Sequence, residues 1–344
     1  MKIYICLSAM LVCVGLPTAA AAESSPALAF SRALTENAQK QKPQKIAFLT
    51  GGSCDANKGN FTNEFAAWNR FLTQKGWQVF PFISADKQSS LAEEFRAMKP
   101  FIWDAFLQEL ASAPLKKGDS LFITFISHGS LENGVHGICD DSQTYNDVSS
   151  LKNILAGFAQ KGVKIGVFDQ SCFGGSSVDQ LDSRAYCVAS SSQYNQEGSG
   201  GVTGRLAEKL QPYAKRNISL EDIWVMTLAA SLKLFRQIPA ISGLGNRNEK
   251  LLRFNRPTKV NYFQKIRDNE TAVFSGKERQ EGLAFIRDNQ KRLREFFPEG
   301  AIVAAEEFFH QNNFFKVSDE AVVAVNYWLD NPAPGQRICA DFVF

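Results

Sequence analysis

The sequence has no run of basic residues, and its opposite charges are interspersed and nearly balanced. It contains 38 Lys and Arg against 35 Asp and Glu, which gives a formal net charge of +3. Nucleic-acid binding requires clustered positive charge, so this class of function is not expected. Internal repeats and low-complexity stretches are also missing. With 44% hydrophobic and 21% charged residues, the chain has the composition of a folded protein with a sizeable core.

Long apolar runs are missing everywhere except at the N-terminus. Lys2 is followed by about a dozen mostly apolar residues and then by an Ala-rich stretch that ends at Ala22, the pattern of a cleavable signal peptide. The run is too short to cross a membrane. We therefore predict a signal peptide over residues 1–22, cut after Ala22. The predicted location is secreted or periplasmic, without stable membrane insertion.

After a polar arm at residues 23–44, expected to be flexible, short apolar segments alternate with segments of helical periodicity. This alternation predicts an α/β fold with a mostly parallel, six-stranded sheet and helices on both faces. We expect this domain to span residues 45–247, and residues 248–344 to form a mainly helical C-terminal module. The expected strands are Lys45–Thr50, Trp77–Ile83, Gly118–Ser127, Val163–Gln170, Arg184–Ser191 and Gln237–Ser242.

Seven cysteines fall to five once the signal peptide is removed. Those five are Cys54, Cys139, Cys172, Cys187 and Cys339. An odd number in an oxidising compartment leaves at least one thiol outside a disulfide. The sequence does not decide which four pair, or in which arrangement.

Two of the expected strands end in residues that can carry covalent chemistry. The strand over residues 118–127 is followed by His128 and Gly129, and the strand over 163–170 is followed within two residues by Cys172. One crossover helix lies between them, so the two strands can be parallel neighbours. Ligands of open α/β sheets bind beyond the carboxyl ends of the strands. We therefore expect the imidazole and the thiol at one edge of the sheet.

A cysteine beside a histidine suits nucleophilic catalysis. A thiolate attacks a carbonyl carbon, and an imidazole can protonate the departing amine. Backbone N–H groups near Gly129 and Cys172 can hold the developing oxyanion, and a glycine lets the substrate approach closely.

Histidine is rare in this chain, which keeps the search for other sites small. Only His128, His136 and His310 occur, and His310 lies in an expected helix without a functional argument. His128, His136 and Cys139 have the wrong spacing for a structural zinc site and lack a fourth ligand nearby. We therefore expect no metal.

The order of the motifs is more specific than either motif alone. Strand, His-Gly, crossover helix, strand and Gln-Ser-Cys-Phe-Gly-Gly resembles the caspase-like superfamily of cysteine peptidases, and within it the legumain (asparaginyl endopeptidase) family. The likeness includes the Gly/Asn-rich loop Gly51–Asn60 and the strand and polar loop Leu181–Ser199. It covers roughly residues 45–243, well over half of the chain.

The resemblance implies a cysteine endopeptidase that needs no cofactor and acts on a peptide or protein substrate. It implies that Cys172 is the nucleophile, that His128 is its acid–base partner, and that Gly129 supplies an oxyanion N–H. Asn57 corresponds to an asparagine that orients the histidine. The substrate-pocket positions that the resemblance implies are Gln170, Ser191, Ser199 and Lys58.

The chain departs from the legumain pattern in the expected pocket. Legumains carry an acidic residue at the position of Gln170 and an arginine in the first loop, where this chain has Gly59 beside Lys58. A glutamine both donates and accepts hydrogen bonds. An Asn, Gln or Asp side chain is therefore expected before the cut bond, whereas an arginine pocket would require a carboxylate.

Other functions remain open from the sequence. An amine can resolve the acyl-enzyme in place of water, which would make the protein a transpeptidase. The fold can also serve as a catalytically inactive, peptide-binding scaffold, although retention of both His128 and Cys172 argues against this. Alternatively, Cys172 is a disulfide partner of Cys187 or Cys139.

Residues 248–344 occupy the place of a legumain pro-domain, and a pro-domain and a partner-binding module are equally compatible with them. The sequence does not indicate an oligomeric state.

Overall fold

The computed structural model of the chain describes residues 43–52, 54, 61–95, 97–181, 185–192, 209–224, 226–227, 240–242 and 338–344, with a few single residues between these ranges. The predicted signal peptide, nearly all of the predicted arm and most of the predicted C-terminal module lie outside the described residues.

Strands and helices alternate along the described chain. The main strands are β1 (Lys45–Gly52), β2 (Gln78–Ile83), β3 (Ser120–Ser127), β7 (Lys164–Asp169) and β8 (Cys187–Ser190). The helices are α2 (Thr62–Gln74), α3 (Ala85–Leu91), α4 (Trp103–Ala111), α5 (Lys152–Gln160) and α6 (Gly175–Gln180), with short 3-10 helices at Val148–Leu151 and Gln211–Tyr213.

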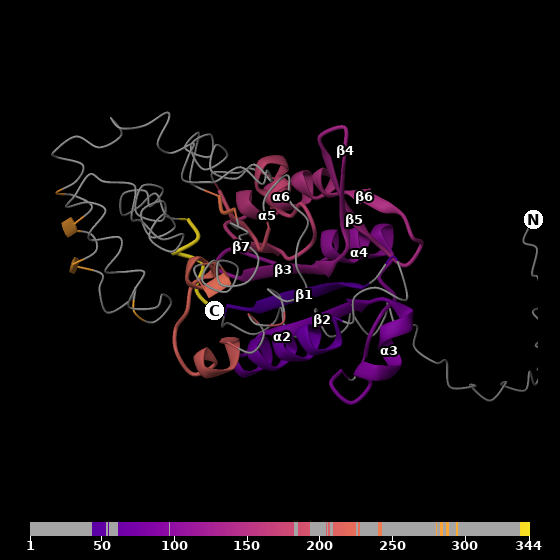
Figure 1. Cartoon of the computed structure of the whole chain (residues 1–344), viewed down its shortest axis with the longest axis horizontal. Helices are drawn as coiled ribbons and strands as arrows, with labels where there is room; N and C mark the ends of the chain where they lie inside the picture. The colour runs from indigo at the N-terminus through magenta and orange to yellow at the C-terminus, as the bar shows by residue number, and fades with distance from the viewer. Residues whose placement is uncertain are drawn as a thin grey trace, which may run out of the picture.

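The main strands form one five-stranded sheet in the order β2-β1-β3-β7-β8, and Figure 1 shows β2, β1, β3 and β7 side by side in this order. Each neighbouring pair is parallel. The predicted mixed α/β fold with a mostly parallel sheet is therefore confirmed.

Both faces of the sheet are covered, which explains why its central strands are apolar along most of their length. Successive residues of β1 point to opposite faces. Ile46 and Phe48 join a buried cluster with side chains of α4 and α5. Ala47 and Leu49 join a second cluster with side chains of α2 and of the C-terminal residues.

The sheet has five strands in the described residues, so the predicted count of six is not confirmed. Only residues 240–242 of the expected sixth strand are described, and they contact β8 through a single antiparallel bridge between Ala189 and Ile241. Two backbone hydrogen bonds, Ser190 N to Ala240 O and Ser242 N to Val188 O, flank this bridge.

Residues 129–147, where the sequence analysis expects no strand, form a small antiparallel sheet of β4 (Gly129–Glu132), β5 (Val135–Cys139) and β6 (Tyr145–Asp147). Figure 1 shows these strands beyond one end of the main sheet. Asn133 and Gly134 form the two-residue turn between β4 and β5, and both have positive φ, 52° and 80°. Asn-Gly is the preferred pair for such a hairpin turn because both residues tolerate this conformation.

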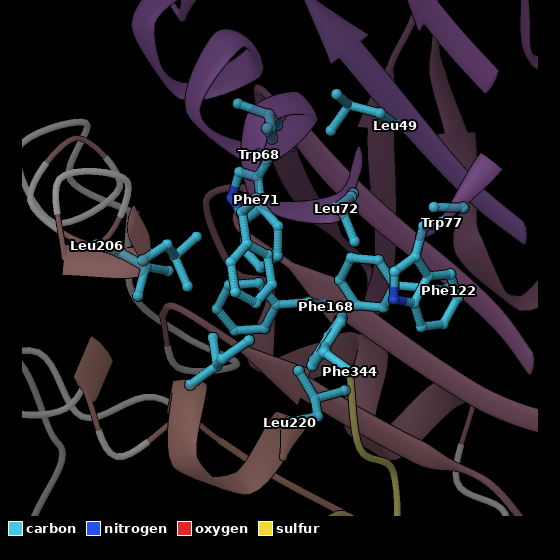
Figure 2. Close-up of a cluster of buried hydrophobic side chains, with 14 of the residues drawn as sticks. Leu49, Trp68, Phe71, Leu72, Trp77, Phe122, Phe168, Leu206, Leu220 and Phe344 are labelled. Carbon is cyan, nitrogen blue, oxygen red and sulfur yellow. The ribbon is translucent and has the colours of Figure 1, made fainter. Parts of the chain in front are cut away.

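The last residues of the chain, assigned from sequence to the C-terminal module, pack into the core of the sheet domain. The backbone of Phe342 and Phe344 hydrogen-bonds Leu220 and Ile218. Figure 2 shows Phe344 within the buried cluster near Phe122, and the two rings meet edge-to-face at 4.9 Å between centroids. A disulfide between Cys187 of β8 and Cys339 ties the same segment to the sheet.

We predict that Phe344→Ala lowers the free energy of unfolding by about 3–5 kcal/mol, because the removed ring leaves a cavity in a close-packed cluster. The control is Val343→Ala, since Val343 is 43% exposed and its truncation should change stability by less than about 0.5 kcal/mol. Urea unfolding of the full chain measures both. Equal effects of the two variants would contradict the packing described for Phe344.

Candidate active site

The pairing of β3 with β7 brings two predicted site residues to the same edge of the sheet. The last paired residues are Phe125 and Asp169, and the ladder continues with a hydrogen bond from Gln170 N to Phe125 O, 2.9 Å. His128 and Cys172 each lie three residues beyond the last pair. Because parallel strands end on the same side, both residues lie at the carboxyl edge.

His128 lies at the junction of the main sheet with the small sheet. Its carbonyl accepts a hydrogen bond from Cys139 N at 3.0 Å, and its ring meets the ring of Phe61 edge-to-face, with centroids 5.7 Å apart. Phe61 directly precedes α2. The half-buried imidazole is thus placed between the start of α2 and the end of β5.

A disulfide reinforces this junction. Cys54, in the loop after β1, is bonded to Cys139 at the end of β5. The hydroxyl of Ser127 lies within hydrogen-bond distance of the carbonyls of Gly52 and Cys139, at 2.9 and 2.8 Å. The ends of β1, β3 and β5 are therefore held together directly beside His128.

Cys172 lies outside both disulfides and is half-buried. The structure therefore contradicts the alternative in which Cys172 is bonded to Cys187 or Cys139, since those two cysteines pair with Cys339 and Cys54. The next residue, Phe173, has a positive φ of 61°. Such a backbone is rare for a bulky side chain and occurs preferentially at functional sites.

One hydroxyl group braces the turn that carries Cys172. Ser192, just beyond β8, donates a hydrogen bond to Ser171 O at 2.8 Å and accepts one from Gly174 N at 2.9 Å. These two backbone groups flank Cys172 and Phe173. Ser192 thus fixes both ends of the sharp turn, although the sequence analysis did not single it out.

Gly129 contacts the Cys172 turn so closely that no side chain fits there. A Cβ atom at Gly129 would lie 2.2 Å from the carbonyl oxygen of Cys172 and 2.7 Å from Oγ of Ser171. The structure therefore brings Gly129, which follows His128, into direct proximity with the backbone of Cys172.

A buried carboxylate lies beneath the Cys172 turn. Asp169 Oδ1 accepts hydrogen bonds from Ser171 N and Ser171 Oγ, at 2.9 and 2.6 Å. Its Oδ2 accepts hydrogen bonds from Ser177 Oγ and from His136 Nε2, the latter at 2.9 Å. Asp169 and His136 are both fully buried, so their charges compensate each other in a region shielded from water.

The surroundings shift the pKa values of this pair in opposite directions. Burial alone would raise the pKa of Asp169, but the charge of His136 and the hydrogen bonds from His136, Ser171 and Ser177 outweigh burial and lower it. Burial alone would lower the pKa of His136, but the charge and hydrogen bond of Asp169, the Ser130 carbonyl and the charge of Asp147 raise it. Both shifts favour the charged forms.

Of the predicted pocket residues, Gln170 and Ser191 are described. Gln170 is 5% exposed, and its Nε2 donates to Thr124 Oγ1 at 2.9 Å. Its Oε1 has no hydrogen-bond partner among the described residues. Ser191 is buried and its N–H donates to Asp169 O. The other three predicted site residues, Asn57, Lys58 and Ser199, lie outside the described residues.

Tyr145 of β6 is a further side chain near Cys172 that the sequence did not reveal. Burial raises the pKa of its phenol, and the negative charges of Cys172 and Glu132 raise it further. Tyr145 is 42% exposed, so the small sheet presents a partly accessible phenol on the same side of the molecule as the thiol.

The part of the chain that the structure describes contains no cluster of three or more His, Cys, Asp or Glu side chains able to hold a metal ion. Among the described helices, none is both long and apolar enough to cross a bilayer.

Comparison of the chain with models of known protein families and with curated proteins found no match.

We predict that Gly129→Ala destabilises the protein by about 1–3 kcal/mol, because the added methyl group displaces the Cys172 turn. The matched control is Gly157→Ala in α5, where a Cβ meets no atom within 4 Å and an alanine should stabilise the helix by up to about 1 kcal/mol. Urea unfolding gives both values, and iodoacetamide labelling of Cys172 reports the displaced turn. An unchanged labelling rate in a destabilised Gly129→Ala variant would contradict this placement.

A second prediction concerns pH. We expect the stability difference between the wild type and the double variant His136→Gln, Asp169→Asn to be largest between about pH 4 and 6.5. The pKa of Asp169 is lowered, so its contribution is present above the ordinary value near 3.9 and is lost as the pH falls through the lowered pKa. The pKa of His136 is raised, so its contribution is complete below about 6.5 and is lost as the pH rises through the raised pKa.

Unfolding of both proteins in urea at a series of pH values measures this difference. A difference that stays constant from acidic to alkaline pH would show that the two buried groups do not titrate as a charged pair.

Proposed function

We propose that the protein is a cysteine endopeptidase in which Cys172 is the nucleophile and His128 the acid–base group. The observation that supports this most directly is the placement of Cys172, His128 and Gly129. A thiol outside both disulfides follows β7, the His-Gly pair follows β3 at the matching register, and Gly129 lies against the carbonyl of Cys172. This placement supports thiol acyl transfer, which needs a thiol, an acid–base group and an oxyanion donor at one place.

In the first step, the Cys172 thiolate attacks the carbonyl carbon of a peptide bond and a carbon–sulfur bond forms. The carbonyl oxygen becomes an oxyanion, and in this proposal the Gly129 N–H stabilises it. The carbon–nitrogen bond then breaks, and His128 gives its proton to the departing amine. A thioester and a new N-terminus result.

In the second step, water attacks the thioester carbon while His128 accepts a proton from it. The carbon–sulfur bond breaks, the new C-terminus leaves as a carboxylic acid, and the thiolate returns to its starting state. No redox change occurs in either step, so the cycle requires only the peptide and water.

The hydrogen bonds around Gln170 favour a carboxamide before the cut bond. The Thr124 hydroxyl donates to Phe168 O at 2.9 Å, so Thr124 can only accept from Gln170, which fixes the orientation of the Gln170 amide. Oε1 therefore remains as an acceptor. This oxygen is buried, so the proposal requires the substrate to displace the residues that cover it; an Asn or Gln side chain can then donate an N–H to Oε1, whereas an ionised Asp cannot.

The proposed location is the secretory or periplasmic compartment. The N-terminal sequence supports it, and so do the two disulfides, Cys54–Cys139 and Cys187–Cys339. Structural disulfides persist mainly in oxidising compartments.

We predict that Cys172→Ala abolishes hydrolysis of peptide-amide substrates, because the covalent step is lost. His128→Ala should lower kcat by roughly 10²- to 10⁴-fold, the usual contribution of a general acid–base group. Profiling with a peptide library on the full chain measures both, and Gly157→Ala serves as the active control. Wild-type rates in the Cys172→Ala protein, with its thermal transition preserved, would overturn the proposal.

A further inference from the structure

A buried ring joins the two segments that carry the proposed chemistry. His136 lies on β5, opposite Leu131 of β4, and contacts Asp169 beneath the Cys172 turn. A Cβ at Gly129 would lie 2.9 Å from Cε1 of this ring. We propose that His136 is held as an imidazolium between Ser130 and Asp169, and that it acts as a positioning residue which sets the Gly129 N–H against Cys172. This inference rests on the function proposed above.

With Asp169 ionised, as its lowered pKa indicates, the hydrogen-bond geometry favours protons on both ring nitrogens. Nδ1 lies 3.0 Å from the carbonyl oxygen of Ser130, which can only accept. Nε2 lies 2.9 Å from Asp169 Oδ2 and 3.3 Å from Ser171 Oγ. The Ser171 hydroxyl has acceptors other than the ring, Asp169 Oδ1 at 2.6 Å and the carbonyl oxygen of Cys172 at 3.2 Å. A neutral imidazole has one N–H and would leave one of these acceptors facing a lone pair.

The groups around the ring are consistent with a positive charge there. Asp169 faces it from the end of β7, and Asp147 at the end of β6 adds negative charge. Ser171 and Ser177, from the turn and from α6, contribute neutral hydroxyls to the carboxylate. Glu132 of β4 is adjacent to the residue paired with His136 and so lies on the opposite face of the hairpin, exposed.

The hydrogen-bonded chain from Ser130 through His136 to Asp169 reaches two different parts of the proposed site. Nδ1 holds the Ser130 carbonyl, one residue beyond the oxyanion donor Gly129. Asp169 holds the Ser171 N–H, one residue before the nucleophile. The charged pair therefore sets the distance between donor and nucleophile without contacting the substrate. Its loss should lower kcat more than it raises KM, since misplacement of reacting groups mainly affects the chemical step.

Variant kinetics on the full chain test this role. His136→Gln with Asp169→Asn replaces the ion pair by two amides that can still hydrogen-bond, which avoids an uncompensated buried charge. We expect kcat to fall by about 10- to 100-fold with KM changed less than about threefold. The matched control is Asp119→Asn at the opposite end of β3. Asp119 is also fully buried and accepts two backbone hydrogen bonds, and kcat should stay within about twofold of wild type.

The protonation of the ring is measured independently by ¹⁵N NMR of histidine-labelled wild-type protein at neutral pH. The chain has three histidines, so single variants assign each ring. Two N–H signals for His136 support the proposal, and one N–H with one lone-pair nitrogen overturns it, whether or not the variants fold. A folded double variant with wild-type kcat also overturns it.

Failure of this inference is distinguishable from failure of the proposed function. If the wild type does not hydrolyse peptides, the peptidase proposal fails, and iodoacetamide labelling of Cys172 replaces kcat as the readout of site geometry. An altered labelling rate in the double variant, with Asp119→Asn unchanged, supports the positioning role. Equal rates in all three proteins overturn it.

Discussion

The parallel ladder between β3 and β7 is the interaction on which the arrangement of this molecule depends. Its register is fixed by side chains on both faces, because a shift of one residue would exchange the members of the two buried clusters. The hydroxyl of Thr124, which donates to Phe168 O, adds a specific contact to the ladder. This register brings His128 and Cys172, which lie 44 positions apart in the sequence, to the same edge of the sheet.

The two ends of the same strands serve different purposes. Along most of their length β3 and β7 carry apolar residues that stabilise the layers. Toward the carboxyl edge they carry Thr124, Asp169 and Gln170, all buried. Burial of such groups costs free energy unless they are hydrogen-bonded, and nearly all of these are. The remaining Gln170 oxygen and the positive φ of Phe173 are local costs of the kind that concentrate at functional sites.

Much of the sheet could be predicted because continuous apolar runs flanked by glycines identify buried parallel strands. The positions of β1, β3 and β7, and hence the shared edge of His128 and Cys172, follow from that pattern. The β4–β5 hairpin was also signalled, by Asn133-Gly134, but it was missed because its two strands are short and lack a regular alternation of apolar and polar residues. The expected sixth strand stays unconfirmed, because only residues 240–242 of it are described.

Other features could not be read from local sequence. The ion pair of His136 with Asp169 forms because the β4–β5 hairpin packs against the end of β7. Neither residue belongs to a sequence motif that would indicate this contact. The Asp within the apolar run "VFDQ" was the one available signal, since an acidic residue is rarely buried without a partner. The packing of Phe344 against Phe122 joins segments more than 200 residues apart, which no periodicity can indicate.

The bond between Cys187 and Cys339 has a consequence for any processing of this chain. The segment from 338 onward is attached to β8 by sulfur as well as by its inserted aromatic rings. Hydrolysis of the backbone anywhere between residues 243 and 337 would therefore yield two polypeptides that remain one particle. Such a nick would escape gel filtration and non-reducing electrophoresis, and would become visible only after a reductant separates the pieces.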